Sequence, residues 1–372
     1  MIAGRLVENA LSLTHEKELT YLISGALPGE DVEIEERARK GSTVFASVVS
    51  IKKKSADRID PVCPYYDICG GCDFLIVNEE RSAFYKAEIV KDNLRHIADV
   101  EKFNILSPFY GSFNGYRHRC RFHVDVKKKE IGFLRKNSSS LVPLSSCMAL
   151  SQKLNEELEK KDSILKAAHQ IMLEKGVNPK THLVEVPAVS YSDQVSFSDS
   201  EIDVLGYKVS ANVFFQSNPS LLPSMLSFVK ENTAGSSVMD LYSGVGTFSR
   251  LFEGEDKKVF AVEREKRCLA LSKKNAPSAM SITSDASLYL KKNRGHFDTV
   301  IVDPPRTGLD RAVVDALKAM RSSRIIYVSC SSVTASRDLK ILLEAYTLSS
   351  CRLFDFYPGT SHTETVYVLD LK

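Results

Sequence analysis

The chain has 372 residues, of which 43% are hydrophobic and 26% are charged, and its formal net charge is +3. At about 100 to 200 residues per domain, this length predicts two or three domains, each large enough for its own core. The ordinary composition excludes intrinsic disorder, collagen and low-complexity sequence, and the net charge is too small to indicate a nucleic-acid binder by itself.

Three features bear on the compartment. The sequence contains no apolar run near the roughly 18 residues that a membrane helix needs, so we expect no membrane partner. Glu8 lies where a signal peptide would have its apolar stretch, which argues against secretion. Eight cysteines are far too few for a disulfide scaffold of this size. We therefore expect a protein of the reducing cytoplasm.

The first 60 residues or so combine short strand-like runs with turn signals. The runs are Thr20–Ser24, Asp31–Glu35 and Val44–Ile51. Several strands so closely spaced predict a small β-barrel of the oligonucleotide-binding kind. The interval from Arg37 to Arg58 is locally basic. This fits a nucleic-acid-binding face, and it fits equally a solvated strand edge protected by lysines.

The middle of the chain mixes loop, helix and strand signals. A cysteine-bearing loop, Pro61–Asp73, precedes a helical pattern that continues through Asp92. The segment Tyr116–Phe122 alternates basic and apolar residues, which predicts a strand with one cationic face. Helical periodicity with many charges predicts one surface helix over Leu154–Lys175.

From about Asn212 the pattern becomes strand, glycine turn, helix, strand, which predicts an α/β region with a parallel, doubly wound sheet. We expect its buried strands at Ser237–Tyr242, Val259–Glu263, Thr299–Asp303 and Ile325–Ser329.

The segment Asp240–Phe248, DLYSGVGTF, leaves the first of these strands and enters a predicted helix. Glycines at such a turn let the backbone pass close to a ligand, and the helix start offers free amides. Glu263 ends the next strand about 20 residues later, where a ribose hydroxyl would donate to it. A tight turn alone would explain the glycines, but this context favours a nucleoside cofactor.

Two residues discriminate between cofactors. Ser249 occupies the position of the third glycine in the dinucleotide fingerprint, which disfavours a pyrophosphate. Asp240 would repel a pyrophosphate but suits the cationic methionyl part of S-adenosylmethionine. We therefore expect a methyltransferase rather than a dehydrogenase. Asp285 fits an acceptor for the adenine amino group and fits equally a helix N-cap.

The hexapeptide Asp303–Gly308, DPPRTG, follows a predicted strand and thus lies at the ligand-binding edge of the sheet. Its two prolines make a rigid ledge beside the cofactor. In amino-methyltransferases a related motif has an aromatic fourth residue, whereas this chain has Arg306. Methylation of an exocyclic amine is therefore disfavoured.

Cys330 follows the next predicted strand, and Glu364 lies in a polar stretch before the last one. Carbon 5 of uracil cannot attack a methyl group unaided. Addition of a thiolate to carbon 6 makes carbon 5 nucleophilic, and a base must later remove the carbon 5 proton. One cysteine and one carboxylate satisfy that chemistry, although Cys330 alone would fit a buried structural thiol.

Five ordered motifs, covering nearly the whole chain, resemble those of the RNA uracil-5-methyltransferases. They are FQxN at Phe215–Asn218, DLYxGxGTF at Asp240–Phe248, DPPRxG at Asp303–Gly308, SCxxxTxxRD at Ser329–Asp338 and HxE at His362–Glu364. This resemblance implies that Cys330 is the nucleophile and Glu364 the base. The residues it implies for the cofactor and uracil pocket are Gln216, Tyr242, Gly244, Thr247, Glu263, Asp285 and Asp303.

The chain departs from the family pattern at three places. Ser331-Ser332 replaces the usual Asn-Pro or Asp-Pro, Gly359 stands where a histidine is common, and Thr247 occupies a position that is Asn in some members. The first departure concerns the loop conformation behind Cys330 rather than the chemistry.

Cys63, Cys69 and Cys72 form a compact, turn-rich cluster. A four-cysteine zinc site normally has two CxxC pairs, and this cluster has one. Three clustered ligands with a distant fourth favour an iron–sulfur site, with zinc as the alternative. Spacing alone permits Cys120 or Cys147 as the fourth ligand. Resemblance to the cluster-bearing branch of the same family implies Cys147 and a [4Fe–4S] cluster, with a structural or RNA-contacting role.

The resemblance implies three domains: an RNA-binding TRAM β-barrel over 1–58, a cluster-bearing α+β domain over 59–205, and a Rossmann-like methyltransferase domain over 206–372. We expect methylation of carbon 5 of one flipped-out uridine in a structured RNA, by a monomer. The basic segments Arg37–Arg58 and Arg117–Arg121 would hold its phosphates. The expected RNA is 23S rRNA, with tRNA as the alternative.

Two rival functions make different predictions. A non-enzymatic, metal-containing RNA-binding protein would explain the barrel and the cysteines but would leave Cys330, Glu364 and the Asp303 hexapeptide unused. An NAD-dependent oxidoreductase with an iron–sulfur centre conflicts with Ser249 and Asp240. Binding of S-adenosylmethionine rather than NAD separates the methyltransferase from both.

Overall fold

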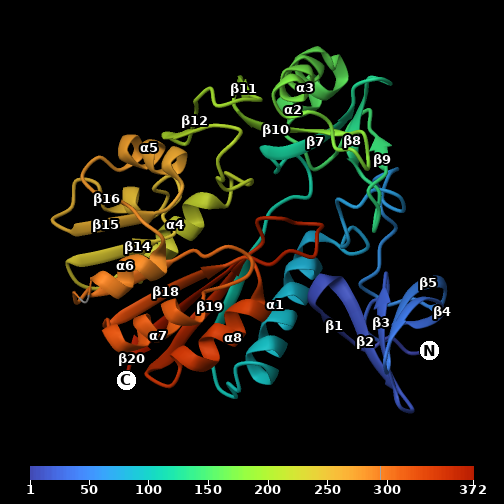
Figure 1. The fold of residues 1–372 in the computed structure, drawn as a ribbon. Helices are drawn as coiled ribbons and strands as arrows, with labels where there is room; N and C mark the ends of the chain where they lie inside the picture. Colours follow the sequence, from blue (N-terminus) through green and yellow to red (C-terminus); the bar gives the residue numbers. More distant parts are fainter. Residues whose placement is uncertain (294) are drawn as a thin grey trace.

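The computed structural model describes residues 1–293 and 295–372, and Figure 1 shows how the chain is arranged. A five-stranded sheet near the N-terminus is followed by a mixed central region and then by a region built on an eight-stranded sheet. Within the described residues, no helix is both long and apolar enough to cross a membrane.

The N-terminal sheet has the strand order β1-β2-β3-β5-β4, in which β3 and β5 run parallel. The amide of Ala3 donates to the carbonyl of Glu30, and the carbonyl of Ala3 accepts from Gly29, so the first residues also pair with the turn before β4. The three strands predicted in this part of the chain are confirmed. The elements are β1 Arg5–Val7, the short 3-10 helix η1 Glu8–Ala10, β2 Leu11–Glu16, β3 Leu19–Ser24, β4 Asp31–Lys40 and β5 Thr43–Lys53.

The central region contains an antiparallel sheet of order β11-β10-β7-β8-β9, against which α2 and α3 pack. Its strand β7 alternates buried Cys120 and Phe122 with Arg119 and Arg121, as the sequence pattern predicted. The elements are α1 Glu79–His96, β6 Ile105–Phe109, β7 Arg119–Asp125, β8 Glu130–Leu134, β9 Leu141–Pro143, α2 Gln152–Lys160, α3 Asp162–Lys175, β10 Val184–Tyr191, β11 Gln194–Ser196, β12 Ile202–Val204 and β13 Tyr207–Val209.

The single surface helix predicted over Leu154–Lys175 is wrong. Lys161 has φ 65°, in the left-handed region, and separates α2 from α3. A break of this kind leaves no mark in the charge pattern, because neither proline nor glycine forms it. Leu154 and Leu158 are fully buried, so this segment contributes to the central core.

The C-terminal sheet has the order β16-β15-β14-β17-β18-β20-β19-β6, with β20 antiparallel to both neighbours. The four strands predicted here are confirmed within one residue at most ends. The elements are α4 Leu222–Glu231, β14 Ser237–Leu241, η2 Ser249–Phe252, β15 Lys258–Glu263, α5 Lys266–Asn275, β16 Met280–Thr283, α6 Ala286–Lys292, β17 Thr299–Val302, α7 Arg311–Met320, β18 Arg324–Ser329, α8 Ser332–Leu342, β19 Tyr346–Phe354 and β20 Thr365–Leu371.

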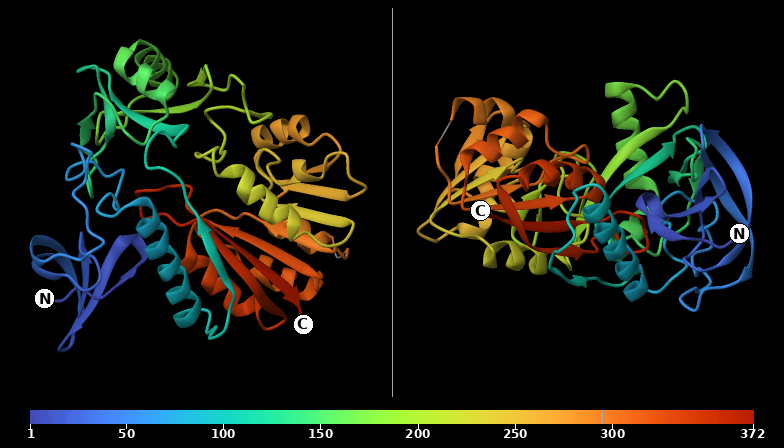
Figure 2. Two further views of the ribbon diagram at one scale, coloured as in Figure 1. Left: turned by 180° about the vertical axis from the view of Figure 1, so that it is seen from behind. Right: turned by 90° about the horizontal axis from the view of Figure 1, so that it is seen from below.

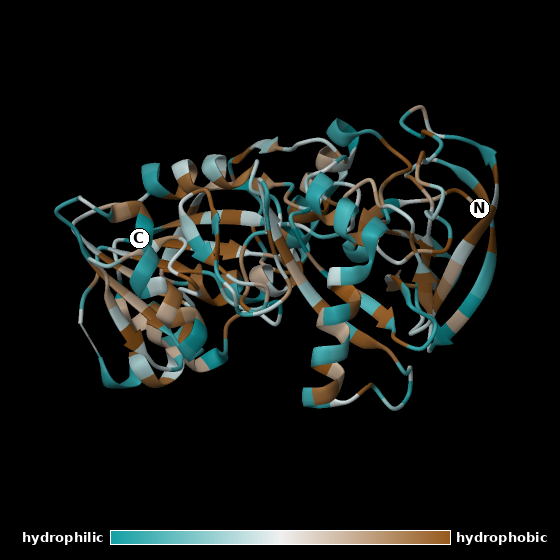
Figure 3. Cartoon of the chain, turned by 90° about the horizontal axis from the view of Figure 1, so that it is seen from above, coloured by the Kyte–Doolittle hydropathy of each residue, from teal (hydrophilic) through white to brown (hydrophobic). Residues whose placement is uncertain are grey.

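Helices cover both faces of this sheet. In β18, Ile325 and Tyr327 belong to one hydrophobic core, while Ile326 and Val328 belong to the other. Successive side chains of a strand point to opposite faces, so these are the two sides of the sheet. α1, α6, α7 and α8 pack on the first side, and α4 and α5 on the second. Figure 3 shows the hydrophobic colours running along these strands.

Two elements from the central part of the sequence belong to the C-terminal sheet. Strand β6 pairs in parallel with β19, and α1 contributes Ala87, Val90 and Leu94 to one of its cores. Figure 2 shows both beside the last strands of the chain. Both elements precede the predicted boundary between residues 205 and 206 but pack in the C-terminal region. That boundary therefore does not separate the two regions completely. The division into 1–58, 59–205 and 206–372 stays a prediction.

Candidate active site

The carboxyl ends of three neighbouring parallel strands bring the predicted site residues to one edge of the sheet. Tyr242 follows β14, Asp303 follows β17 and Cys330 follows β18. Open α/β sheets bind their ligands at this edge, because the loops after adjacent strands meet there. Glu364 immediately precedes β20, whose first residue Thr365 lies opposite Ser329. It therefore lies at the same edge although its strand runs in the opposite direction.

The turn after β14 is held by two acidic side chains. Asp240 Oδ2 accepts hydrogen bonds from Ser249 N at 3.0 Å and from Ser249 Oγ at 2.6 Å. Glu263 Oε2 accepts from Gly244 N at 3.0 Å. The serine at the third-glycine position thus has a structural partner in Asp240. Burial raises the pKa of Asp240 to about 7.

Close packing makes one glycine of this turn necessary. Gly246 has φ 81°, and a Cβ at this position would lie 2.7 Å from Ser272 Oγ. Tyr242 also has a positive φ of 61°, which is rare for a residue with a bulky side chain. Strained backbone of this kind is concentrated at ligand-binding and catalytic sites.

Two buried polar atoms of the predicted site residues have no partners. Gln216 Oε1 and Asp240 Oδ1 are buried, and neither has a hydrogen-bond partner among the residues that the structure describes. A buried acceptor without a donor costs free energy, so both fit a ligand that brings donors. S-adenosylmethionine has such groups in its ribose and its ammonium. The residues present therefore fit this cofactor.

The remaining predicted cofactor residues lie around the same turn but make different contacts. The Thr247 carbonyl accepts from Tyr207 Oη at 3.1 Å. Asp285 Oδ1 caps α6 by accepting a hydrogen bond from Ser287 N at 2.9 Å. The helix N-cap, which the sequence left open as an alternative, is therefore present. A contact of Asp285 with adenine stays a prediction.

Asp303, Cys330 and Glu364 influence one another electrostatically. Burial raises the pKa of Glu364 well above its usual range, and the nearby Asp303 raises it further. Burial also raises the pKa of the Cys330 thiol to about 12; Glu364 and Asp303 raise it further, while Arg306 lowers it. Cys330 and Glu364 therefore lie in one weakly solvated region, in which the negatively charged form of each side chain is disfavoured.

Cys330 and Glu364 line a common cavity of about 590 Å³. Basic side chains make up much of the rest of its lining: Arg117, Arg119, Arg121, Arg135, Arg306 and His123. Arg119 Nε is buried and has no partner among the described residues. A cavity with a thiol, a carboxyl and several guanidinium groups is suited to an anionic substrate that undergoes nucleophilic and proton-transfer chemistry.

The nucleophile loop, Ser329–Ser332, is anchored by two distant elements. Ser331 Oγ donates to Glu8 Oε1 of the N-terminal region at 3.2 Å. Asn93 Nδ2 of α1 donates to Ser332 Oγ at 2.8 Å. Sequence reasoning had identified Ser331-Ser332 as unusual but not Glu8 or Asn93. Both serine side chains thus act as hydrogen-bonding groups, whereas the proline of an Asn-Pro or Asp-Pro sequence has no polar side-chain atom to take the place of Ser332 Oγ.

Sequence reasoning also missed a buried ion pair. Lys86 Nζ lies 2.6 Å from Asp355 Oδ1, and both side chains are 0% exposed. Lys86 lies on the face of α1 that also buries Ala83, Ala87 and Val90. The sequence did contain a signal for this pair, a lysine within the apolar stripe of a predicted helix, because a buried ammonium needs an anionic partner.

The four predicted metal-binding cysteines line one small cavity of about 30 Å³, which Cys120 does not line. Burial raises the pKa of Cys72 to about 12, and the neighbouring thiols of Cys147 and Cys69 raise it further. Among the described residues, however, no group of three or more His, Cys, Asp or Glu side chains is placed to hold a metal ion. The structure thus brings Cys63, Cys69, Cys72 and Cys147 together around a cavity, without forming a site for a single ion.

The basic residues of the N-terminal region are only partly available to a partner. Arg58 is buried against Glu30, with Nη2 2.7 Å from Oε2, and it also donates to the carbonyl of Gly25. The expectation that Arg58 binds phosphate is therefore wrong, because its guanidinium is satisfied inside the protein. Lys52 pairs with Glu33 at 3.0 Å. Arg39, Lys40 and Lys53 form no ion pair among the described residues.

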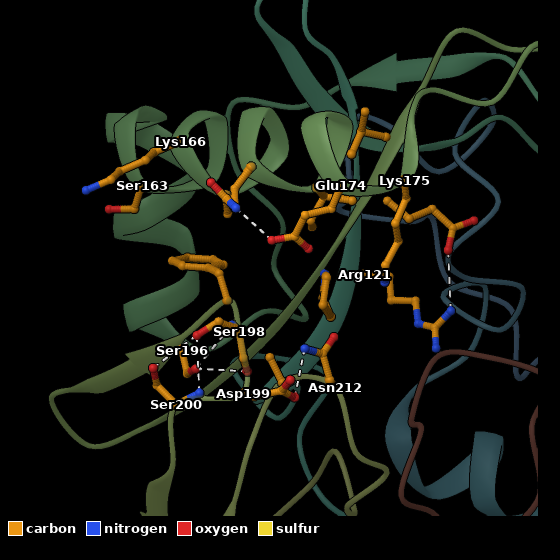
Figure 4. A pocket seen from close by; sticks show the side chains of 18 of the residues that line it. Arg121, Ser163, Lys166, Glu174, Lys175, Ser196, Ser198, Asp199, Ser200 and Asn212 are labelled. Atoms are coloured by element: carbon orange, nitrogen blue, oxygen red, sulfur yellow. Dashed lines mark hydrogen bonds and ion pairs between the residues drawn. The ribbon is translucent and has the colours of Figure 1, made fainter. Parts of the chain in front are cut away.

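A larger cavity of about 1040 Å³ lies between α3 and the strands beside it, and it contains none of the predicted catalytic, cofactor or metal residues (Figure 4). Some of its polar groups pair with one another: Gln170 with Glu174 at 2.6 Å and Asn212 with Asp199 at 2.9 Å. Arg121, which also lines the smaller cavity, pairs with Glu185 at 3.3 Å.

Comparisons with known proteins agree with this geometry. A family model described as tRNA (uracil-5-)-methyltransferase matches residues 287–372. An uncharacterized RNA methyltransferase of Thermotoga maritima is 28% identical, with 98% of this chain and 97% of that protein covered. The 23S rRNA (uracil(1939)-C(5))-methyltransferase RlmD of Vibrio parahaemolyticus is 26% identical, with 98% and 94% covered.

A solved structure shares the fold of the whole chain. The tRNA (uracil-54, C5)-methyltransferase of Pyrococcus abyssi, in complex with S-adenosyl-L-homocysteine, has a TM-score of 0.71 at 20% identity, with 99% of each chain covered. Together with the five motifs and the cavity that joins Cys330 to Glu364, these matches make the chain similar, over nearly its whole length, to RNA uracil-5-methyltransferases.

Proposed function

We propose that this protein methylates carbon 5 of one uridine in 23S rRNA, with S-adenosylmethionine as the methyl donor. The observation that carries the proposal is the cavity in which Cys330 and Glu364 lie among five arginines. The relatives named as 23S rRNA methyltransferases match nearly the full length of the chain, which supports rRNA as the substrate. The cavity is large enough for a flipped-out nucleotide, which duplex or stacked RNA would otherwise hide.

In this proposal the reaction begins with Cys330. Its thiolate adds to carbon 6 of the uracil, the carbon 5–carbon 6 double bond opens, and the electron pair moves through carbon 5 to the carbonyl at carbon 4. Gln216, Tyr242, Gly244, Thr247, Glu263, Asp285 and Asp303 would hold S-adenosylmethionine, whose methyl group would pass from its sulfonium to carbon 5 and leave S-adenosylhomocysteine. Cys330 then carries a covalent adduct in which carbon 5 holds both the methyl group and a proton.

Glu364 completes the reaction by removing the carbon 5 proton. The electron pair of that bond reforms the carbon 5–carbon 6 double bond, and Cys330 leaves as a thiolate. A general base is most efficient when its pKa lies close to the working pH. Burial beside Asp303 raises the pKa of Glu364 in that direction, which supports its role as the base.

The RNA is bound, in this proposal, by the arginines of the cavity and by the N-terminal sheet. Phosphate contacts from Arg and Lys dominate the affinity of nucleic-acid binding. Arg117, Arg119, Arg135 and Arg306 line the cavity. Arg39, Lys40 and Lys53 extend the basic surface on β4 and β5. The order of the N-terminal strands and their connection through Ala3 support an oligonucleotide-binding barrel of the TRAM type.

We also propose that Cys63, Cys69, Cys72 and Cys147 hold a [4Fe–4S] cluster. Four thiolates around one cavity support it. In such a cluster each cysteine binds a different iron, so the sulfur atoms need not converge on one point. A single zinc ion would require that convergence. Anaerobically purified protein should contain about four iron and four sulfide per chain. Stoichiometric zinc in colourless protein would contradict the proposal.

The substrate is tested by methylation assays on defined RNA. Purified protein and S-adenosylmethionine should convert one uridine to 5-methyluridine in a 23S rRNA transcript, as mapped by mass spectrometry, and should leave a tRNA transcript unmodified. RNA from a strain that lacks the gene should lose the same mark. Loss of 5-methyluridine from tRNA alone would show that tRNA is the substrate.

A further inference from the structure

The segment that carries the proposed base is held from outside the methyltransferase sheet. This base loop, Asp355–Glu364, connects β19 to β20 and places Tyr357, Thr360, His362 and Glu364 at the catalytic cavity. Only its ends are adjacent to strands. A segment of this kind takes its conformation from the side chains and backbone that contact it.

Asp73 and its neighbour Phe74 make three hydrogen bonds that fix the middle of the base loop. The amides of Asp73 and Phe74 both donate to the carbonyl of Gly359, each at 2.9 Å. In the reverse direction, the amide of Ser361 donates to Asp73 Oδ2 at 3.2 Å. These contacts lie three and five residues from Glu364 in the sequence, so they constrain the backbone that carries its carboxyl.

Gly359 shows how closely the two segments approach. It has φ 77°, and a Cβ at this position would lie 2.7 Å from Leu75 Cδ2 and 3.5 Å from Phe113 Cδ1. Only glycine combines this backbone conformation with this spacing. The position where related chains commonly have histidine is therefore occupied here by a residue that permits direct packing on Leu75.

Asp73 is the last residue of the cysteine loop, Cys63–Asp73, and another residue of that loop holds it in place. It follows Cys72 directly, and its carbonyl accepts a hydrogen bond from Tyr66 Oη at 2.7 Å. Tyr66 lines the cavity formed by the four cysteines. Asp73 Oδ1 also lies 3.5 Å from Lys136 Nζ. A continuous set of contacts thus connects the four-cysteine cavity to Asp73 and then to the base loop.

We propose that Asp73 is a positioning residue for Glu364, so that the cysteine loop, and the cluster it would hold, fixes the general base in place. This inference rests on the proposed function, in which Glu364 removes the carbon 5 proton. It gives the four cysteines a role in a reaction that needs no electron transfer. It also predicts that Asp73 acts on one step, the elimination of Cys330, and not on the addition of Cys330 or on RNA binding.

The test separates these steps in a single-turnover assay with ordinary uridine RNA. The covalent protein–RNA adduct is quantified on denaturing gels as it forms and decays. In Asp73→Ala, the adduct should form within about twofold of the wild-type rate and decay about tenfold more slowly, because a small displacement of a catalytic group carries a large kinetic cost. Because elimination follows methyl transfer, kcat/KM for RNA should stay within about twofold, while kcat falls.

Two matched variants control this experiment. Asp73→Asn keeps an oxygen that can accept from Ser361 N, so it should restore most of the decay rate. Lys136→Gln removes the ion pair with Asp73 and the cation–π contact with Tyr66 but leaves the Asp73–Ser361 hydrogen bond, and it should behave as wild type. Decay of the Asp73→Ala adduct at the wild-type rate would overturn the inference. An equal slowing of formation and decay would also overturn it, because Asp73 would then support the whole cavity.

Hydrogen–deuterium exchange supplies a readout that does not depend on activity. Removal of the cluster with a chelator under oxidising conditions should raise exchange in peptides that cover the base loop and leave those of β14 and β18 unchanged. Gly359→Ala, in which the four cysteines are intact, should raise exchange in the same peptides while the iron content stays constant. Unchanged exchange of the base loop in both samples would overturn the inference.

Failure of the proposed function gives a different result from failure of this inference. If Glu364 is not the base, Glu364→Gln will not accumulate the methylated adduct in the same assay, whatever Asp73→Ala does. If Glu364 is the base but Asp73 does not position it, Glu364→Gln will stall as the adduct while Asp73→Ala behaves as wild type.

Discussion

Cys330 directly follows a central parallel strand, whereas Glu364 lies at the end of a segment that leaves the sheet after β19 and returns to it in β20. The nucleophile loop forms its own hydrogen bonds, with Ser329 Oγ 2.9 Å from the Ser331 carbonyl and the Ser331 side chain at the start of α8. The base loop depends instead on Lys86 and Asp73, which lie more than 260 residues earlier in the chain.

The difference shows that the two catalytic groups rest on different parts of the molecule. The position of Cys330 follows mainly from the sheet that forms the fold of the family. α1 contacts both catalytic loops, through Asn93 and through Lys86, but the position of Glu364 requires the cysteine loop as well. Changes in the central region should therefore affect proton removal more than they affect thiolate addition.

The largest effect is expected for Cys330→Ala. This variant cannot form the bond to carbon 6, so turnover should fall below detection while binding of S-adenosylmethionine and RNA stays near wild type. With RNA that contains 5-fluorouridine, the wild type should form a stable adduct, because fluorine cannot leave as a cation. The adduct should map to Cys330 by mass spectrometry. Cys268→Ala, which changes a buried thiol on α5, should retain activity; an adduct on another cysteine would refute the assignment.

Glu364→Gln should be the next most severe change. Glutamine preserves the volume and a hydrogen-bonding group but cannot accept the carbon 5 proton. Addition and methyl transfer should proceed, and a methylated protein–RNA adduct should accumulate on ordinary uridine RNA as a slow band on a denaturing gel. Glu344→Gln, which disrupts a surface pair with Lys318, serves as the control. Loss of turnover without any adduct would indicate a role in binding instead.

The buried pair under the base loop should matter for stability. Lys86→Met leaves the buried Asp355 without its cation, and breaking such a pair costs about 3–5 kcal/mol. Urea unfolding should show this loss, and the double variant Lys86→Met/Asp355→Leu should recover most of it. Lys340→Met, which breaks an exposed pair with Asp99, should change stability by about 0.5 kcal/mol or less. Equal losses from the two lysine variants would contradict the comparison.

The pH dependence of adduct formation should reflect the pKa of the Cys330 thiol. The thiolate of Cys330 is the reactive form, and burial with its acidic neighbours raises the pKa of the thiol to about 12. Below that pKa the thiolate fraction rises about tenfold per pH unit, so adduct formation on 5-fluorouridine RNA should rise with pH from 6 to 9. A rate that is constant over this range would show that the thiol pKa is far lower when RNA is bound.

The smallest effect is expected at Glu8. Glu8→Ala removes the acceptor for Ser331 Oγ, and one such hydrogen bond contributes about 1 kcal/mol. Adduct formation should slow about fivefold, while adduct decay stays unchanged. Glu8→Gln keeps an acceptor and should restore the rate. If decay slows instead of formation, the N-terminal region acts on the base loop and not on the nucleophile loop.

Much of the C-terminal sheet could be predicted from the sequence, because strands such as Ser237–Leu241 and Thr299–Val302 are continuous apolar runs between turn signals. The same reasoning brought Tyr242, Asp303 and Cys330 to one edge, since parallel strands end together. These inferences depend on local patterns and on one topological rule.

The rest required contacts between distant parts of the chain. The pairing of β6 with β19 and the ion pair of Lys86 with Asp355 join residues about 240 to 270 apart, and no local pattern specifies such a partner. The break at Lys161 was hidden because the charge pattern continues across it. Burial of Arg58 against Glu30 could not be distinguished from an exposed basic surface.

The pairing of strand β6 has a consequence for folding during synthesis on the ribosome. The strand pairs with β19, which is synthesised about 240 residues later. At roughly 5–20 residues per second, α1 and β6 emerge on the order of 10 to 50 s before their partners exist. During that interval the apolar stripe of α1 is exposed to water and to other nascent chains. Trigger-type chaperones that shield apolar surface should therefore affect the yield of this protein more than that of a methyltransferase whose sheet is encoded by one contiguous stretch.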